Sequence, residues 1–305
     1  MSTAWPTSWF DEPRISRGGV RTDVPLKGLT TFAIGGPARV LVEPLDPESA
    51  VAVVRRAIER GVSLRILGNG SNLLVSDSGV DGVVLSTARM RRCVQDGERF
   101  QIWAGSPLVG FVNHAAKVGL SGVEGIIGIP AHIGGAIRMN AGGKWGEIFD
   151  VVESVSVCDL ATGEPRRLAR AECNPKYRDA NLGDVLVLET TLRLRPANPK
   201  EVAEATKEHL LEKNASQPVV EPSAGCIFKN PKGEAAAGRS AAKLIQDAGL
   251  KGTRIGGVEV SRKHSNYFVN CGGGTCVDAL SLVDLVVKRV EGSSGIRLET
   301  EVKIW

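Results

Sequence analysis

Apolar residues spaced for one helix face alternate along this chain with short runs rich in β-branched residues, which predicts a mixed α and β protein. Residues 47–60 show the helical spacing most clearly, with Val51 and Val54 on one face and Gly61 at the end. A second helix is expected to open at Ser106 and Pro107 and to close at Gly119. The remaining predicted helices are 240–248 and 279–290, and the predicted strands are 62–67, 83–86, 100–104, 151–157 and 185–194.

The end of the chain alternates between apolar and charged residues, as a strand with two different faces does. Apolar residues stand at 296, 298, 302 and 304, whereas Glu301 belongs to the intervening charged set. Two interpretations stay open at this point. The charged face is either free for chemistry or the solvated outer face of an edge strand.

The length of 305 residues and the hydrophobic fraction of 42% suggest about two domains with a sizeable core. Pro196, Asn198 and Pro199 interrupt the pattern, so the domain boundary is expected near residues 195–200. No apolar run approaches the roughly 18 residues of a membrane span, and the first 17 residues lack a secretory apolar stretch. We therefore expect a cytoplasmic protein with no membrane partner.

The six cysteines are scattered and contain no C-x-x-C pair, so neither a disulfide framework nor a metal site is expected. The net charge of +4 is too small to indicate nucleic-acid binding. Residues 226–265 nevertheless hold eight basic against three acidic side chains. This segment would suit a phosphorylated ligand, although a solvated basic face would have the same composition.

Two glycine-rich stretches in the first half are candidates for binding phosphate. They are residues 67–73, Leu-Gly-Asn-Gly-Ser-Asn-Leu, and residues 128–143. Glycine lets backbone N–H groups approach a ligand, and consecutive amides in tight turns can hold phosphate oxygens. The first stretch lacks the third glycine of a dinucleotide fingerprint, which argues against a Rossmann fold. Each stretch alone could also be a plain turn.

Residues 223–231, Ser-Ala-Gly-Cys-Ile-Phe-Lys-Asn-Pro, place one thiol three residues before a cation and an amide. Cys226 could supply an acidic proton beside an anion held by Lys229 and Asn230. The alternative is an ordinary tight turn with a small buried cysteine.

Several segments, in this order, resemble the UDP-N-acetylenolpyruvoylglucosamine reductase (MurB) family over residues 22 to the end. They are Thr30-Thr31-Phe32 with Ile34-Gly35-Gly36-Pro37-Ala38, the two glycine stretches, Tyr177-Arg178-Asp179, the 223–231 turn, Lys263-His264-Ser265-Asn266 and Glu301-Val302. The short interval between Arg178 and Cys226 is similar to the type II form of the family.

The resemblance implies an α+β protein with an FAD-binding fold of the vanillyl-alcohol-oxidase (PCMH) type and a smaller C-terminal α+β substrate-binding domain. The expected domains are an N-terminal extension (1–20), an FAD-binding domain of two subdomains (21–197) and a substrate-binding domain (198–305). The strand 296–305 either stays with the substrate-binding domain or returns to the FAD domain. The implied function is that of an oxidoreductase, UDP-N-acetylmuramate dehydrogenase, which is a flavoprotein of peptidoglycan synthesis and hence of cell-wall biogenesis, cell shape and cell division. It would hold FAD tightly, use NADPH as co-substrate and reduce UDP-N-acetylglucosamine enolpyruvate to UDP-N-acetylmuramate. We expect a monomer that binds only small molecules.

The resemblance also implies roles for individual residues. Catalysis would fall to Arg178 as a carboxylate clamp, Cys226 as the proton donor and Glu301 as a group that polarises or protonates the enol. The implied cofactor-binding residues are Gly68, Asn69, Gly70, Ser71, Asn72, Gly128, Ile129, Gly134, Gly135, Asn140 and Gly142. The implied substrate-binding residues are Tyr177, Arg178, Lys229, Asn230, His264 and Asn266.

This chain departs from the family pattern at three places. Cys226 replaces a common serine, Ala33 replaces a common arginine, and Ala131-His132 replace a glycine and a small residue. Two other functions remain open: a flavin-dependent sugar or hydroxy-acid oxidase on the same fold, and a nucleotide-sugar-binding protein without catalysis. The oxidase would have no need of the Cys226 turn together with Arg178 and Glu301, and the binding protein would lack flavin.

Overall fold

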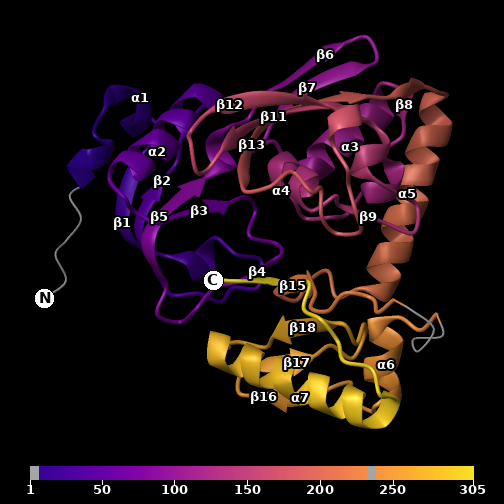
Figure 1. The fold of residues 1–305 in the computed structure, drawn as a ribbon. Helices are drawn as coiled ribbons and strands as arrows, with labels where there is room; N and C mark the ends of the chain where they lie inside the picture. Colours follow the sequence, from indigo (N-terminus) through magenta and orange to yellow (C-terminus); the bar gives the residue numbers. More distant parts are fainter. Residues whose placement is uncertain (1–6, 233–237) are drawn as a thin grey trace, which may run out of the picture. The chain divides into compact units, whose positions relative to one another are not determined.

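A computed structural model describes residues 7–232 and 238–305 (Figure 1). These residues form two compact units, and each is built from separated segments of the chain. The first unit contains the described residues up to Val24, Ala38–Asn69 and Asp81–Glu212, and the second contains Pro25–Pro37, Gly70–Val80 and the described part of Lys213–Trp305. Residues 1–6 of the expected N-terminal extension lie outside the described residues.

The first layer of the first unit is a four-stranded sheet packed on helix α2 (Pro47–Glu59). Its strand order is β1 (Val20–Pro25), β2 (Pro37–Val42), β5 (Val80–Ser86) and β3 (Leu64–Leu67), and β3 runs parallel to β5. Asp46 begins α2 because its carboxylate accepts the amide of Ser49 at 2.7 Å. The predicted helix at 47–60 is therefore confirmed. The short elements η1 (Thr7–Phe10) and α1 (Pro13–Ser16) precede this layer.

The second layer of the first unit is a five-stranded antiparallel sheet. Its order is β12 (Pro165–Ala169), β11 (Val152–Asp159), β13 (Val185–Arg193), β7 (Arg99–Trp103) and β6 (Cys93–Asp96). Helices α3 (Leu108–Lys117) and α4 (Ile133–Arg138) lie against one face (Figure 1), where Phe100, Phe111 and Ile137 share one buried core. The predicted strands at 100–104, 151–157 and 185–194 are confirmed, with ends that differ by one or two residues.

The second unit is a four-stranded sheet covered by a long helix. The order is β15 (Ser223–Cys226), β18 (Tyr267–Asn270), β17 (Val258–Val260) and β16 (Arg254–Ile255), and the helices are α6 (Ala241–Asp247) and α7 (Cys276–Ser294). Phe32, Ile34 and Leu74 come from early in the chain yet belong to the same core as α7. The last strand, β19 (Lys303–Ile304), runs parallel to β4 (Leu73–Leu74).

Short elements complete the described chain. They are the strand pairs β8 (Leu120–Ser121) with β14 (Arg195–Pro196) and β9 (Gly142–Gly143) with β10 (Gly146–Glu147), and the 3-10 turns η2 (Leu26–Gly28), η3 (Thr87–Arg89), η4 (Glu124–Ile126), η5 (Ile148–Asp150) and η6 (Arg170–Glu172). Among the helices of residues 7–232 and 238–305, none is long and apolar enough to cross a membrane.

Helix α7 begins with two independent caps. Thr275 and Asp278 form a capping box, in which each side chain accepts the backbone amide of the other residue. Asp77 adds a cap from a distant part of the chain, because its two carboxylate oxygens accept the amides of Cys276 at 2.8 Å and Val277 at 3.1 Å. Residues 70–80 are thus tied to the start of α7.

Three expectations about elements are corrected. Residues 199–216 form a helix, α5 (Pro199–Ser216), where the prolines had indicated only a break, because Pro199 occupies a first-turn position that needs no backbone N–H. The stretch 128–143 contains the helix α4, not only turns. The terminal strand is reduced to Lys303–Ile304, and Ile304 is 46% exposed, so it does not belong to the buried set with Ile296, Leu298 and Val302.

The border between the two units also differs from the expected linker. The chain passes from the first unit to the second between Glu212 and Lys213, which lies inside α5 and beyond residues 195–200.

Candidate active site

The two predicted glycine stretches meet in the first unit. Gly68 and Asn69 follow strand β3, and the side-chain Nδ2 of Asn69 donates to the carbonyl of Pro130 at 2.6 Å. A Cβ added at Gly68 or Gly135 would meet no other atom within 4 Å. The backbone at these two positions therefore lies beside open space that a ligand can occupy.

Other glycines of this stretch are required by packing. A Cβ at Gly134 would lie 2.8 Å from the Cβ of Ala104, and one at Gly142 would lie 2.4 Å from the Cβ of Glu147. The amide of Gly134 donates to the carbonyl of Ala104, which fixes α4 against the end of β7. Gly128 has a φ of 77°, a conformation that favours glycine.

Two polar side chains near these glycines carry buried atoms without a partner within the described protein. His132 is 6% exposed and its Nδ1 has no hydrogen bond, and Asn140 is fully buried and its Oδ1 has none. Burial, together with the smaller effect of the positive charge of Arg91, lowers the pKa of His132 to about 4. The imidazole is therefore neutral at pH 7, and a bound polar ligand could pair with such groups.

Arg178 lies in a tight turn of the first unit. Lys176 and Asp179 exchange backbone hydrogen bonds across this turn, and Arg178 itself has a φ of 59°. Its Nη1 donates to the carbonyl of Gly142 at 2.8 Å, and its guanidinium carbon lies 5.1 Å from the ring centroid of Tyr177. The predicted pair Tyr177 and Arg178 is thus in contact with the end of the second glycine stretch.

The second unit brings Cys226 and Glu301 into neighbouring backbone. Cys226 ends strand β15, and the carbonyl of the next residue, Ile227, accepts the amide of Glu301 at 2.7 Å. The side-chain Nδ2 of Asn72 donates to the carbonyl of Glu301 at 3.4 Å. Thus the first predicted loop, the thiol turn and the terminal segment all meet here.

The predicted substrate-binding residues of the second unit differ in their surroundings. Asn266 is 2% exposed, and its side chain bonds both backbone groups of Phe228, accepting the N–H at 2.9 Å and donating to the carbonyl at 2.8 Å. Asn230 is exposed, and its Oδ1 accepts the amide of Ala241 at 3.0 Å. Both side chains hold the ends of the thiol turn.

Lys229 and His264 complete this group. The ammonium of Lys229 lies 3.5 Å from Glu299, an exposed ion pair that contributes little to stability. The ring of His264 packs edge-on against Tyr267 with centroids 4.9 Å apart. Burial lowers the pKa of His264, and the charge of Lys251 acts in the same direction.

The predicted residues therefore fall into two sets, one in each unit. The first unit holds Gly68, Asn69, Gly128, Ile129, Gly134, Gly135, Asn140, Gly142, Tyr177 and Arg178, and the second holds Gly70, Ser71, Asn72, Cys226, Lys229, Asn230, His264, Asn266 and Glu301. Sequence reasoning missed Arg138 and Lys176, which link the glycine stretch to the Arg178 turn. Arg138 pairs with Asp179, and the carbonyl of Lys176 accepts a hydrogen bond from Asn140. No local pattern marks them, because their partners lie about 40 residues away.

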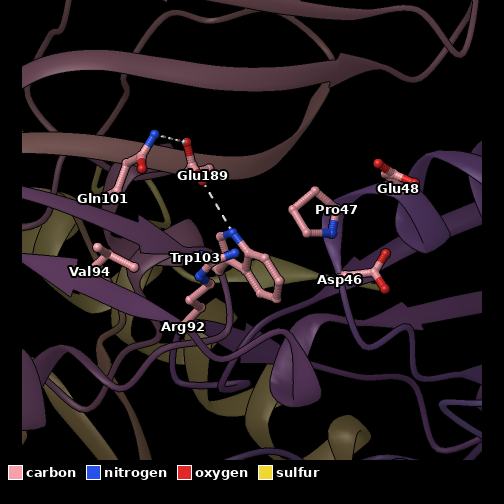
Figure 2. A pocket seen from close by; sticks show the side chains of 8 residues that line it. All are labelled: Asp46, Pro47, Glu48, Arg92, Val94, Gln101, Trp103 and Glu189. Carbon is pink, nitrogen blue, oxygen red and sulfur yellow. Dashed lines mark hydrogen bonds between the residues drawn. The ribbon is translucent and has the colours of Figure 1, made fainter.

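A cavity of about 540 Å³ on the five-stranded sheet includes none of the predicted residues (Figure 2). At its centre, Gln101 and Trp103 donate to the two carboxylate oxygens of Glu189, at 3.3 and 3.1 Å. The guanidinium of Arg92 covers the ring of Trp103 at 5.4 Å. Because these polar groups already pair with one another, the candidate residues remain the two sets described above, the glycine stretch with the Arg178 turn in the first unit and the thiol turn with the terminal segment in the second.

Comparisons with known proteins identify the family of this chain. Residues 38–169 match the model of an FAD binding domain, and residues 217–305 match the model named UDP-N-acetylenolpyruvoylglucosamine reductase, C-terminal domain. Among curated relatives, UDP-N-acetylenolpyruvoylglucosamine reductase 2 of Symbiobacterium thermophilum is 40% identical, with 94% of this chain and 92% of the relative covered. The UDP-N-acetylenolpyruvoylglucosamine reductase of Moorella thermoacetica is 39% identical, with 94% and 93% covered.

A solved structure is similar to this chain in fold as well as in sequence. The UDP-N-acetylenolpyruvylglucosamine reductase (MurB) of Thermus caldophilus superposes with a TM-score of 0.80 at 36% identity, covering 94% of this chain and 99% of that one. The predicted architecture, an FAD-binding α+β fold followed by a smaller C-terminal α+β domain, is confirmed. The open backbone at Gly68 and Gly135 and the unpaired buried atoms of His132 and Asn140 fit an FAD cofactor. With relatives of this similarity over nearly its whole length, the chain belongs to the UDP-N-acetylenolpyruvoylglucosamine reductase family.

Proposed function

We propose that this protein reduces UDP-N-acetylglucosamine enolpyruvate to UDP-N-acetylmuramate in peptidoglycan precursor synthesis, with NADPH as the electron donor. The family and the FAD-binding domain support this reaction. The single observation that carries it is the hydrogen bond between Ile227 and Glu301, which makes the thiol turn and the terminal carboxylate segment neighbours. A flavin-dependent oxidase has no need of such a pair.

FAD, when bound, supplies hydride chemistry. The residues proposed to hold it in the first unit are Gly68 and Gly135, beside whose backbone there is open space, and Asn69, which joins the two glycine stretches. Asn140 and His132 offer polar atoms at the same stretch.

Arg178 is proposed to bind the carboxylate of the enolpyruvyl group. A guanidinium presents planar donors that match a carboxylate, and its charge favours the build-up of negative charge during reduction. Its contact with Gly142 and with the ring of Tyr177 restricts the side chain before any ligand arrives. Such restriction lowers the entropy lost on binding.

Cys226 is proposed to give the proton to the α carbon of the substrate. A thiol with a pKa near 8.5 is mostly protonated at pH 7 and is a far stronger acid than the serine hydroxyl common in the family. Glu301 is proposed to polarise or protonate the enol. Lys229 and the neighbouring basic residues of 226–265 are proposed to bind the diphosphate.

The proposed working form is a monomer in the cytoplasm. The test of the function is an absorption spectrum of the purified protein, followed in one cuvette by anaerobic NADPH and then by UDP-N-acetylglucosamine enolpyruvate. Bleaching of a flavin by NADPH and return of colour with the enolpyruvyl substrate are the expected results. A flavin that stays reduced would contradict the substrate and favour an oxidase, and absence of flavin after incubation with FAD would favour a binding protein.

A further inference from the structure

Two segments of the first unit, residues 138–142 and 176–180, are joined by four interactions. Arg138 forms an ion pair with Asp179 at 3.0 Å, and the carbonyl of Arg138 accepts the amide of Ala180 at 3.2 Å. Two further hydrogen bonds run in opposite directions. Asn140 Nδ2 donates to the carbonyl of Lys176 at 3.2 Å, and Arg178 Nη1 donates to the carbonyl of Gly142 at 2.8 Å.

Asn140 and Arg178, which donate these two hydrogen bonds, both have a positive φ. Asn140 has a φ of 42° and Arg178 a φ of 59°. Asparagine adopts this region more readily than other non-glycine residues, whereas arginine does so rarely, and such positions concentrate at functional sites. Here each of the two residues holds the segment that contains the other.

Burial indicates which of these four interactions contribute most to holding the two segments together. The side chain of Asn140 is fully buried and its bond to Lys176 is part-buried, so water competes less for this bond than for a surface ion pair. The side chains of Arg138 and Asp179 are 42% and 54% exposed, and ion pairs of this kind contribute little. The bond from Asn140 is therefore the main side-chain link that does not involve Arg178 itself.

We propose that Asn140 is a positioning residue for Arg178, and that it joins the flavin-binding stretch and the Arg178 turn into one rigid element. The role of Arg178 toward substrate rests on the proposed function, whereas the mechanical link does not. Asn140 bonds the 176–180 segment and Arg178 bonds the 138–142 segment. Binding of FAD to the glycine stretch therefore also stabilises the turn at 176–180. The substrate carboxylate then meets a guanidinium that is held more firmly when the cofactor is in place.

The test is hydrogen–deuterium exchange of the apoprotein with and without FAD, for the wild type and for Asn140→Asp. This substitution preserves the shape of the side chain and puts an oxygen where Nδ2 donates to Lys176. The matched control is Asn181→Asp, since Asn181 is exposed and has a similar φ of 54° in the adjoining turn.

In the wild type, FAD is expected to slow exchange in both 128–143 and 174–182. In Asn140→Asp, exchange in 174–182 is expected to become up to about tenfold faster, which corresponds to the loss of one part-buried hydrogen bond, and FAD no longer slows it. The KM for the enolpyruvyl substrate should rise by a similar factor with a smaller change in kcat, whereas Asn181→Asp should resemble the wild type.

Unchanged exchange in 174–182, or equal protection of both segments by FAD in Asn140→Asp, would overturn the proposal. If that variant does not fold, Arg138→Gln combined with Asp179→Asn tests the weaker link, with an expected increase in exchange of about twofold. A wild type that shows coupled protection but does not reduce the enolpyruvyl substrate would refute the proposed function and leave the link intact.

Discussion

Replacing Asn266 with alanine separates a structural role from direct contact with substrate. Sequence motifs predict that Asn266 binds substrate, but its side chain is 2% exposed and bonds both backbone groups of Phe228. Phe228 is itself fully buried, so its N–H and carbonyl lose their partners in Asn266→Ala. We therefore expect this variant to lose stability before it loses any contact with a ligand.

The expected loss of unfolding free energy follows from the number of backbone groups of Phe228 that lose their hydrogen-bond partner. A buried polar group left without a partner costs about 1–3 kcal/mol, so two such groups destabilise the protein by about 2–6 kcal/mol. With a urea dependence of about 3 kcal/mol per molar, the unfolding midpoint should fall by about 0.7–2 M. The matched control is Asn230→Ala, because Asn230 is exposed and loses one hydrogen bond, worth about 1 kcal/mol.

The assay is urea unfolding followed by circular dichroism, with kcat and KM measured below both transitions. Asn266→Ala should show a lower midpoint and a reduced kcat/KM, since the turn that contains Cys226 is no longer held. Asn230→Ala should keep its midpoint within a few tenths of a molar. An unchanged midpoint in Asn266→Ala together with a raised KM would refute the reasoning, because the amide would then be acting on substrate.

Three further predictions concern the thiol, the long helix and one histidine. Cys226→Ser should keep substantial activity, whereas Cys226→Ala should lose product formation while NADPH is still oxidised slowly; full turnover in the alanine variant would contradict the proton-donor role. Asp77→Ala should lower the unfolding free energy by about 1–2 kcal/mol, because α7 loses two hydrogen bonds to a carboxylate at its start, and Asp77→Asn should lose less, as urea midpoints will show. His132 has a pKa of about 4 in the folded protein against an ordinary value of 6.5, so the stability that depends on its neutral form is lost as pH falls from about 6.5 to 4. His132→Gln should remove this pH-dependent loss of stability. If the urea midpoints of the variant and the wild type depended equally on pH, His132 would not be its cause.

Much of the fold followed from local patterns, and the exceptions have physical causes. The helix at 47–60 combines an N-terminal cap, one apolar face and a following glycine, so every local signal agrees. Helix α5 has only a weak apolar face, and Pro199 resembles a break as much as a start. At the C-terminus, alternation predicted a long strand, yet only Lys303–Ile304 has a strand partner, because pairing depends on where β4 lies.

In the candidate site, too, residues in local motifs were predictable from the sequence, whereas hydrogen bonds between residues far apart in the chain were not. The motifs located Cys226, Arg178 and both glycine stretches, since glycine and reactive side chains are visible in the sequence. They did not reveal that Asn266 closes hydrogen bonds on Phe228, 38 positions away, or that Asn140 reaches Lys176. Such partners depend on tertiary contacts that no local spacing encodes.

The interleaving of the two units has a consequence for synthesis of the protein in the cell. Residues 25–37 and 70–80 leave the ribosome early, but they share a core with α6 and α7, which are made about 200 residues later. The amide of Ser76 even bonds the carbonyl of Trp305. The second unit is therefore completed only after residue 305 has left the ribosome, and its early segments must stay unaggregated until then. A fragment beginning at residue 213 would lack part of its own core, so we expect it to require the two early peptides in trans to fold.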